Sequence, residues 1–217
     1  MSDLERTHAL IFALQAEMKD DKKFRDLCER HGLPWDFERG YEPRWYNGPP
    51  PEQVKVLILM AEPAAITPTE ARNLGKPISH GDWIASEDKH YWRANLRDLC
   101  RHIWPVHTED NMYERLGVSC SFWMSLPPEA PQTKQIPSEP VIYFVKTYLR
   151  RFLTIFPPSA VILAAGVTKA AGRLKILKGV QFEQCRALTK PESVKPSART
   201  SWRDAGEKIK QMLERSA

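Results

Sequence analysis

Apolar side chains recur every three or four positions in several stretches of the chain, which is the spacing of a helix with one buried face. The pattern is clearest in residues 91–103, where Trp92, Leu96, Leu99 and Ile103 share one face. Helices are predicted over residues 4–18, 22–30, 91–103, 141–156, 168–177 and 202–215.

Four shorter runs predict strands, over residues 54–59, 117–124, 160–165 and 180–188. Residues 54–59 (VKVLIL) and 160–165 (AVILAA) are almost continuously apolar, which is typical of parallel strands buried on both faces. Strands that alternate with helices predict the α/β class, here a three-layer α/β/α fold with a mostly parallel four-stranded central sheet. We expect one domain over residues 1–217, with a helical and loop extension at 1–50 and the core that carries the site at 54–215.

Composition and charge limit the class of protein, the partners and the cellular location that we expect for this domain. The chain has 217 residues, of which 42% are hydrophobic and 27% charged, as in ordinary soluble globular proteins. Its net charge of +5 permits an anionic partner without requiring one. No apolar run approaches the ~20 residues of a membrane span, and the acidic N-terminal segment does not resemble a signal peptide. We expect a cytoplasmic protein that acts as a monomer.

The cysteines and histidines do not predict a metal site. The four cysteines contain no C-x-x-C pair, and the six histidines show no ligand spacing. We therefore expect free, buried thiols and neither metal nor cofactor. In open parallel sheets the ligand lies beyond the carboxyl ends of the strands, so the loops after Leu59, Met124 and Leu188 are the candidate site.

The motifs at these strand ends resemble those of the uracil-DNA glycosylase superfamily. Residues 54–65 (VKVLILMAEPAA) resemble its first motif, and residues 75–78 (GKPI) its Gly-x-Pro-aromatic segment. Residues 158–171 (PSAVILAAGVTKAA) resemble a later strand and helix, and residues 190–192 (KPE) stand where the family has His-Pro-Ser. The twelve residues from Lys190 to Trp202 match the spacing of the single-strand-selective branch.

The resemblance implies hydrolysis of the bond between a base and its deoxyribose, after the nucleotide has left the stack. Glu62 aligns with the family's water-activating position, and Lys190 with its His, where an ammonium can stabilise negative charge on the leaving base. The alternatives are a helix-capping carboxylate for Glu62 and a solvated loop lysine for Lys190. Residues 195–197 (KPS) are a competing register for the same loop.

The residues that the resemblance assigns to the base pocket are small or weakly specific. They are Ala61, Pro63, Ala64, Ala65, Ile78 and Ser121. Ala64 stands where classical uracil enzymes have a Tyr that rejects a 5-methyl group, and Ser121 where the family often has a base-reading Asn. We therefore expect a pyrimidine with a bulky C5 substituent as the target, in DNA repair or in defence against phages with hypermodified DNA.

The rim of this site is expected to contact DNA through four residues, namely Trp83, Lys195, Ser197 and Arg199. The final helix is expected to begin near Ser201 and to direct its free amides at a phosphate. Three other functions remain open: a DNA-binding module without catalysis, a repair glycosylase that excises plain uracil, and a hydrolase of free nucleosides.

Overall fold

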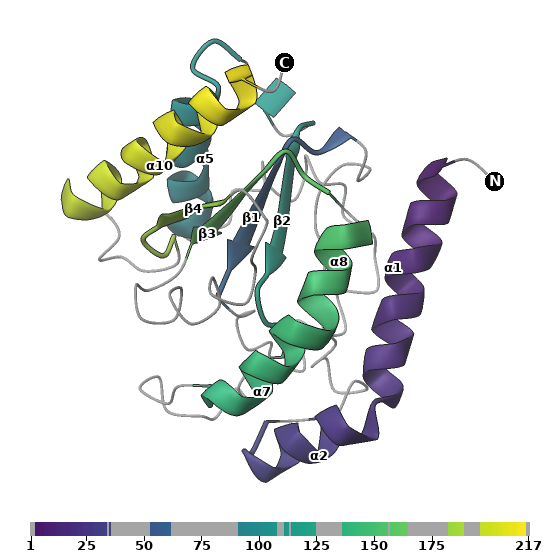
Figure 1. The fold of residues 1–217 in the computed structure, drawn as a ribbon. Coiled ribbons are helices and arrows are strands. Elements are labelled where there is room, and N and C mark those ends of the chain that lie inside the picture. Colours follow the sequence, from purple (N-terminus) through teal and green to yellow (C-terminus); the bar gives the residue numbers. More distant parts are fainter. Residues whose placement is uncertain are drawn as a thin grey trace. The chain divides into compact units, whose positions relative to one another are not determined.

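The computed structural model describes residues 3–33, 35, 53–61, 91–107, 111–112, 114–124, 136–155, 157–164, 182–188 and 196–215 (Figure 1). The described elements fall into two compact units. We call the unit with the β-sheet, α5 and α10 the sheet unit, and the unit with the remaining helices the helical unit.

The sheet unit is built on four strands: β1 (Val56–Met60), β2 (Leu116–Cys120), β3 (Ala160–Ala164) and β4 (Phe182–Cys185). Their order across the sheet is β2-β1-β3-β4, so the chain adds strands on both sides of β1. The pairs β1–β3 and β3–β4 are parallel. The predicted fold class, α/β with a parallel four-stranded central sheet, is confirmed.

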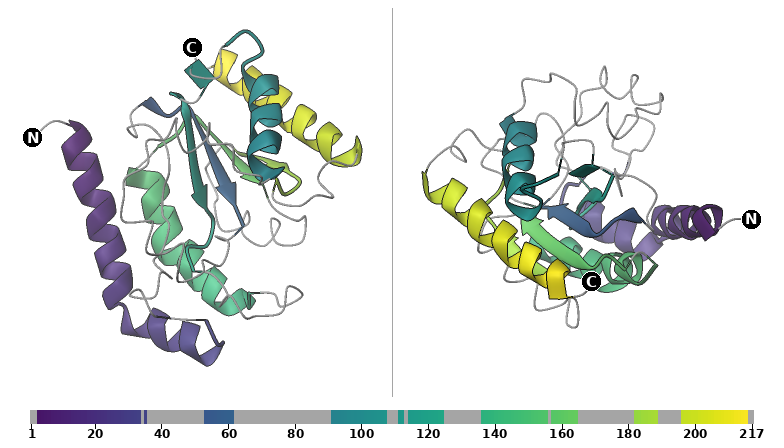
Figure 2. Two further views of the ribbon diagram at one scale, coloured as in Figure 1. Left: turned by 180° about the vertical axis from the view of Figure 1, so that it is seen from behind. Right: turned by 90° about the horizontal axis from the view of Figure 1, so that it is seen from above.

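One face of the sheet packs against α5 (Tyr91–Ile103) and α10 (Pro196–Arg215), which lie on the same side of it (Figure 2). As predicted, Leu96, Leu99 and Ile103 of α5 are buried in this core. On the opposite face Leu57 and Leu163 have no exposed area either. Both faces of the sheet are therefore covered, as a three-layer fold requires.

A glycine allows α5 and α10 to approach closely. A Cβ atom built on Gly206 of α10 would lie 2.6 Å from the Cβ of His102 and 3.3 Å from the carbonyl oxygen of Leu99. These neighbours are backbone or the stiff root of a side chain, so neither can move aside easily. The helix contact thus depends on the missing side chain at position 206.

The helical unit contains α1 (Asp3–Asp20), α2 (Lys22–Arg30), α7 (Ser138–Phe144), the π-helical turn η2 (Val145–Leu149) and α8 (Arg150–Ile155). Its core is aromatic and centres on Phe24, whose ring lies within 6.3 Å, centroid to centroid, of five other rings. These belong to Trp35, Phe122, Tyr143, Phe144 and Tyr148.

Asp21 links α2 to the continuous helix formed by α7, η2 and α8, which we call the long helix of this unit. As N-cap of α2 it accepts a hydrogen bond from the Phe24 amide (3.0 Å), and its other oxygen accepts one from the Tyr143 hydroxyl (2.9 Å) and one from Tyr148. Burial raises the pKa of Asp21, but the hydrogen bonds from Tyr148, Phe24 and Tyr143 outweigh it, and the pKa ends below its usual range.

The structure corrects several predicted boundaries, among them that of the last strand, which ends at Cys185 rather than at Leu188. The final helix begins at Pro196 rather than near Ser201, because proline is well tolerated in the first turn of a helix, where no N–H is needed. The second strand ends at Cys120, and Phe122 and Trp123 lie in the aromatic core of the helical unit. The helix predicted over 141–156 begins at Ser138 and is interrupted by η2. The helix predicted over 168–177 lies outside the described residues.

Candidate functional site at the carboxyl edge of the sheet

The strand register brings the carboxyl ends of the sheet unit to one edge. Met60 of β1 is opposite Ala164 of β3, and Ala164 is opposite Cys185 of β4. At the amino ends of the strands, the amides of Lys55 and Val56 donate to the carbonyl oxygen of Arg115 (2.9 and 3.2 Å). The strands β1 and β2 therefore begin at the same level of the sheet. The loops that follow the strands therefore leave the sheet from the same side, where α/β proteins bind their ligands.

The segment after β4 is held in place by three hydrogen bonds. The hydroxyl of Ser201 accepts from the Arg186 amide (3.1 Å), and the indole N–H of Trp202 donates to the Arg186 carbonyl (3.0 Å). Two residues on, the Asn95 amide donates to the Leu188 carbonyl (2.7 Å). The path of the chain is thus fixed up to two residues before Lys190.

Asn95 is a buried polar anchor that comes from a distant part of the sequence. Asn95 is 8% exposed and lies on α5, 93 positions before Leu188 in the sequence. Sequence reasoning missed Asn95 and the anchoring contacts of Ser201 and Trp202. The available signal was a single amide within the apolar face of a predicted helix, because a buried amide needs a hydrogen-bond partner.

Four predicted site residues lie in the described part of the chain. Ala61 directly follows β1 and is half-buried, and Ser121 directly follows β2 and is fully buried. Ser197 and Arg199 are exposed on the first turn of α10, not on a loop. Two positions apart on a helix, they do not share a face, and their contact with DNA stays a prediction. Outside the described residues lie Glu62, Pro63, Ala64, Ala65, Ile78, Trp83, Lys190 and Lys195.

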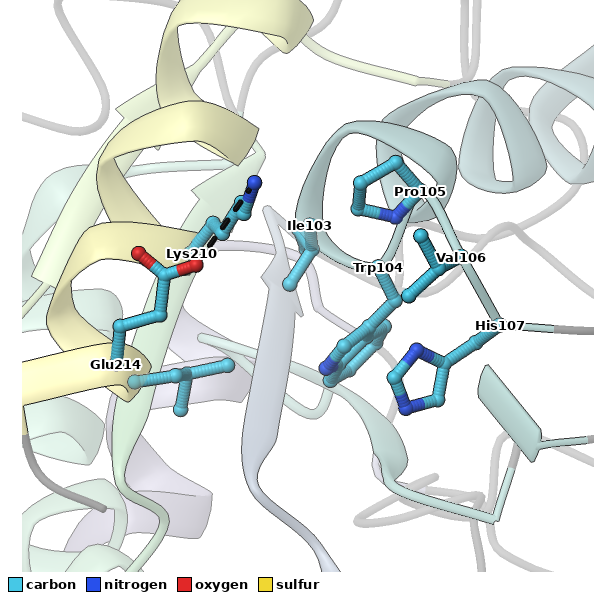
Figure 3. A pocket seen from close by; sticks show the side chains of 8 residues that line it. Ile103, Trp104, Pro105, Val106, His107, Lys210 and Glu214 are labelled. Atoms are coloured by element: carbon cyan, nitrogen blue, oxygen red, sulfur yellow. Dashed lines mark ion pairs between the residues drawn. The ribbon is translucent and has the colours of Figure 1, made fainter.

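A cavity of about 300 Å³ lies elsewhere in the sheet unit, where α5 and α10 end (Figure 3). Trp104, Val106 and His107 line one side of it, and the Lys210–Glu214 ion pair (3.8 Å) the other. The ends of these helices lie near the amino ends of the strands (Figure 1). This cavity is therefore on the side of the sheet opposite to the predicted site.

The cysteines fit no nucleophilic role. None of the four forms a disulfide and all are buried, as expected from the sequence. Burial raises the pKa of Cys185 to about 12, and burial together with the charges of Glu29 and Asp21 raises that of Cys28 to about 12. Among the described residues no group of three or more His, Cys, Asp and Glu side chains could hold a metal ion. In the same residues no helix is long and apolar enough to cross a bilayer.

Comparison with known proteins gives distant structural likenesses and no match by sequence. No family model matches the chain, and no curated protein matches it. Among solved structures it is similar to the solution NMR structure of a "putative Uracil DNA glycosylase" from Methanosarcina acetivorans. The identity is 12% and the TM-score 0.45, over 73% of this chain and 92% of that chain. At that level the likeness carries no argument about activity.

Proposed function

We propose that the chain is a DNA glycosylase that releases an everted pyrimidine with a bulky C5 substituent and leaves an abasic site. The proposal rests on glycosylase-like motifs that follow strands whose carboxyl ends share one edge. The carboxyl ends of β1 and β4 are separated by two strand spacings because β3 lies between them. This distance is about 10 Å, since neighbouring strands lie ~4.8 Å from each other. In the proposal the base and its deoxyribose lie between the segments that follow these two strand ends.

In the proposed reaction Glu62 lies beneath the deoxyribose. Its carboxylate stabilises positive charge on the sugar as the bond between C1′ and the base breaks, and it accepts a proton from the attacking water. The bonding electrons leave with the base, whose developing negative charge is stabilised by the Lys190 ammonium. The water oxygen ends on C1′ and completes the hydrolysis.

The hydrogen bonds around the segment after β4 support the assignment of Lys190. A group that stabilises a transition state has to be held before the reaction begins, because ordering it during the reaction would cost free energy. Asn95, Ser201 and Trp202 hold residues 186–188 from α5 and α10. We assign Asn95 as a positioning residue, since it acts through the backbone and not on the substrate.

The base specificity follows from the small residues assigned to the pocket. Ala64 and Ala65 are small residues at the positions that the resemblance assigns to C5, and the buried Ser121 stands where the family often has an amide. A pocket without the blocking Tyr does not reject a large C5 group by steric clash. Such bases occur in hypermodified phage DNA, so defence against phages is the setting we favour, with the enzyme acting as a monomer in the cytoplasm.

The test is release of base from oligonucleotides that carry uracil, cytosine, hydroxymethylcytosine or a glucosylated pyrimidine, scored as abasic sites. We expect the C5-substituted bases to be released faster than uracil. Glu62→Gln should reduce release about 100-fold or more and leave binding unchanged, because only proton acceptance and charge are lost. Uracil release equal to or faster than that of every substituted base would refute the specificity.

The same experiment separates the rival functions. If the unaltered protein and Glu62→Gln bind alike and neither releases a base, the chain is a DNA-binding module without catalysis. If free nucleosides are hydrolysed as fast as bases in DNA, it is a nucleoside hydrolase.

A further inference from the structure

A groove with a positive rim runs between α2 and the long helix of the helical unit, which lie side by side (Figure 1). Its cavity volume is about 320 Å³. Lys23 and Arg30 line it from α2, and Lys146 lines it from η2. Lys23 and Arg30 are seven positions apart on one helix, which is about 10 Å along its axis.

The positive charge of the groove is only partly compensated. Glu139 is the one acidic residue among those that line it, and His31 (2.9 Å) and Arg30 (4.0 Å) already contact its carboxylate. The hydrogen bond from His31 lowers the pKa of Glu139, so it is ionised at neutral pH. Lys23 and Lys146 form no ion pair with any described residue. With three cations and one carboxylate, the lining keeps a formal charge of 3 − 1 = +2.

The floor of the groove is apolar and rigid. Ile142 is 42% exposed, one of four exposed large hydrophobic residues in the described part of the chain, and Tyr143 lies beside it. The Tyr143 ring stacks on Phe24 (centroids 5.6 Å apart, planes at 12°), and its hydroxyl is held by Asp21 (2.9 Å). The Lys23 ammonium lies 5.3 Å from the centre of the same ring. These contacts fix the position of the Tyr143 ring within the groove.

We propose that this groove binds the sugar–phosphate backbone of a single DNA strand. Cations on both rims fit an anion that repeats along a chain, and the apolar floor between them fits deoxyribose. The inference rests on the proposed function, because it takes DNA as the substrate, and it adds a contact surface outside the predicted site. An acidic peptide is the competing anionic occupant, and the test below separates it from DNA.

The test compares two double variants that each remove two positive charges. Lys23→Gln with Lys146→Gln alters the groove, and Lys208→Gln with Lys210→Gln alters α10 as the matched control. Binding of an unmodified, fluorescent single-stranded oligonucleotide is measured by anisotropy at several salt concentrations. We expect the groove variant to bind about tenfold more weakly and to lower the salt slope by about 1.4, since each phosphate contact contributes ~0.7 for single strands.

The outcomes keep this inference apart from the glycosylase proposal. The proposal that the groove binds DNA is overturned if the groove variant and the control have equal affinities, or if the unaltered protein does not bind. A groove variant that loses affinity for oligoglutamate but not for DNA overturns it as well. If the groove variant binds DNA weakly while the unaltered protein releases no base, the groove stands and the catalytic proposal fails. Protection of Lys23 and Lys146 from acetylation by bound DNA is the second readout, and it needs no variant.

Discussion

The two units of the molecule hold their shape by different means. In the sheet unit, strand register and an apolar core against α5 and α10 set the positions, and hydrogen bonds from Asn95, Ser201 and Trp202 hold the segment after β4. In the helical unit, rings surround Phe24 and one carboxylate, Asp21, joins two helices. The two units are therefore vulnerable at different points: the sheet unit at close backbone contacts such as that of Gly206, and the helical unit at charged contacts such as the Asp21 cap.

The largest effect is expected from Asp21→Ala. The substitution removes an N-cap and leaves two tyrosine hydroxyls without their acceptor, which together should lower the free energy of unfolding by about 3 kcal/mol. Chemical denaturation measures the loss, and hydrogen exchange shows whether α2 and α7 open first. Asp26→Ala, an exposed change on the same helix, is the control and should have little effect. Equal losses in the two variants would contradict the role of the cap.

Gly206→Ala tests the sheet unit in the same way. Alanine normally stabilises a helix by about 1 kcal/mol relative to glycine, but here the new Cβ would meet the Cβ of His102. The clash should exceed the gain and leave a net loss of about 1–2 kcal/mol. Thermal unfolding measures it, with Glu207→Ala on the exposed side as the control. A stabilised variant would mean that α5 and α10 adjust without cost.

Asn95→Ala should affect catalysis more than stability. The Leu188 carbonyl loses its buried donor, at a cost of about 1–2 kcal/mol, and the segment before Lys190 loses an anchor. We expect a lower rate of base release with little change in KM, since the substrate does not touch Asn95. Ser201→Ala, which removes the neighbouring hydrogen bond, should show the same split to a smaller extent. A change in KM alone would contradict the role of Asn95 as a positioning residue.

The smallest expected effect is a loss of stability of the helical unit at low pH. The pKa of Asp21 is below its ordinary value of 3.8, so its stabilising contribution is complete above that value and disappears as the pH falls through the lower folded-state pKa. The helical unit should therefore loosen below about pH 4, before the sheet unit does. Near-UV circular dichroism from pH 6 to 2 follows the tyrosines, and Asp21→Ala should flatten the transition.

The sequence was most informative where structure is decided locally. The bounds of α2 and α5 agree with prediction, because their apolar faces and end signals lie within the helices themselves. The start of α10 was wrong, since Pro196 fits either a loop or a first helical turn. The π turn and the Asn95–Leu188 contact depend on packing between distant segments, which periodicity does not encode. The roles of Glu62 and Lys190 stay predictions.

The enclosed thiols have a practical consequence. With pKa values of about 12, Cys28 and Cys185 are almost wholly protonated at neutral pH, and Cys100 and Cys120 are buried as well. Maleimide reagents should therefore leave the native protein unmodified. A new cysteine placed on the surface would take up dye alone, so fluorescence could follow either unit during titration with oligonucleotides without first removing the natural sulfurs.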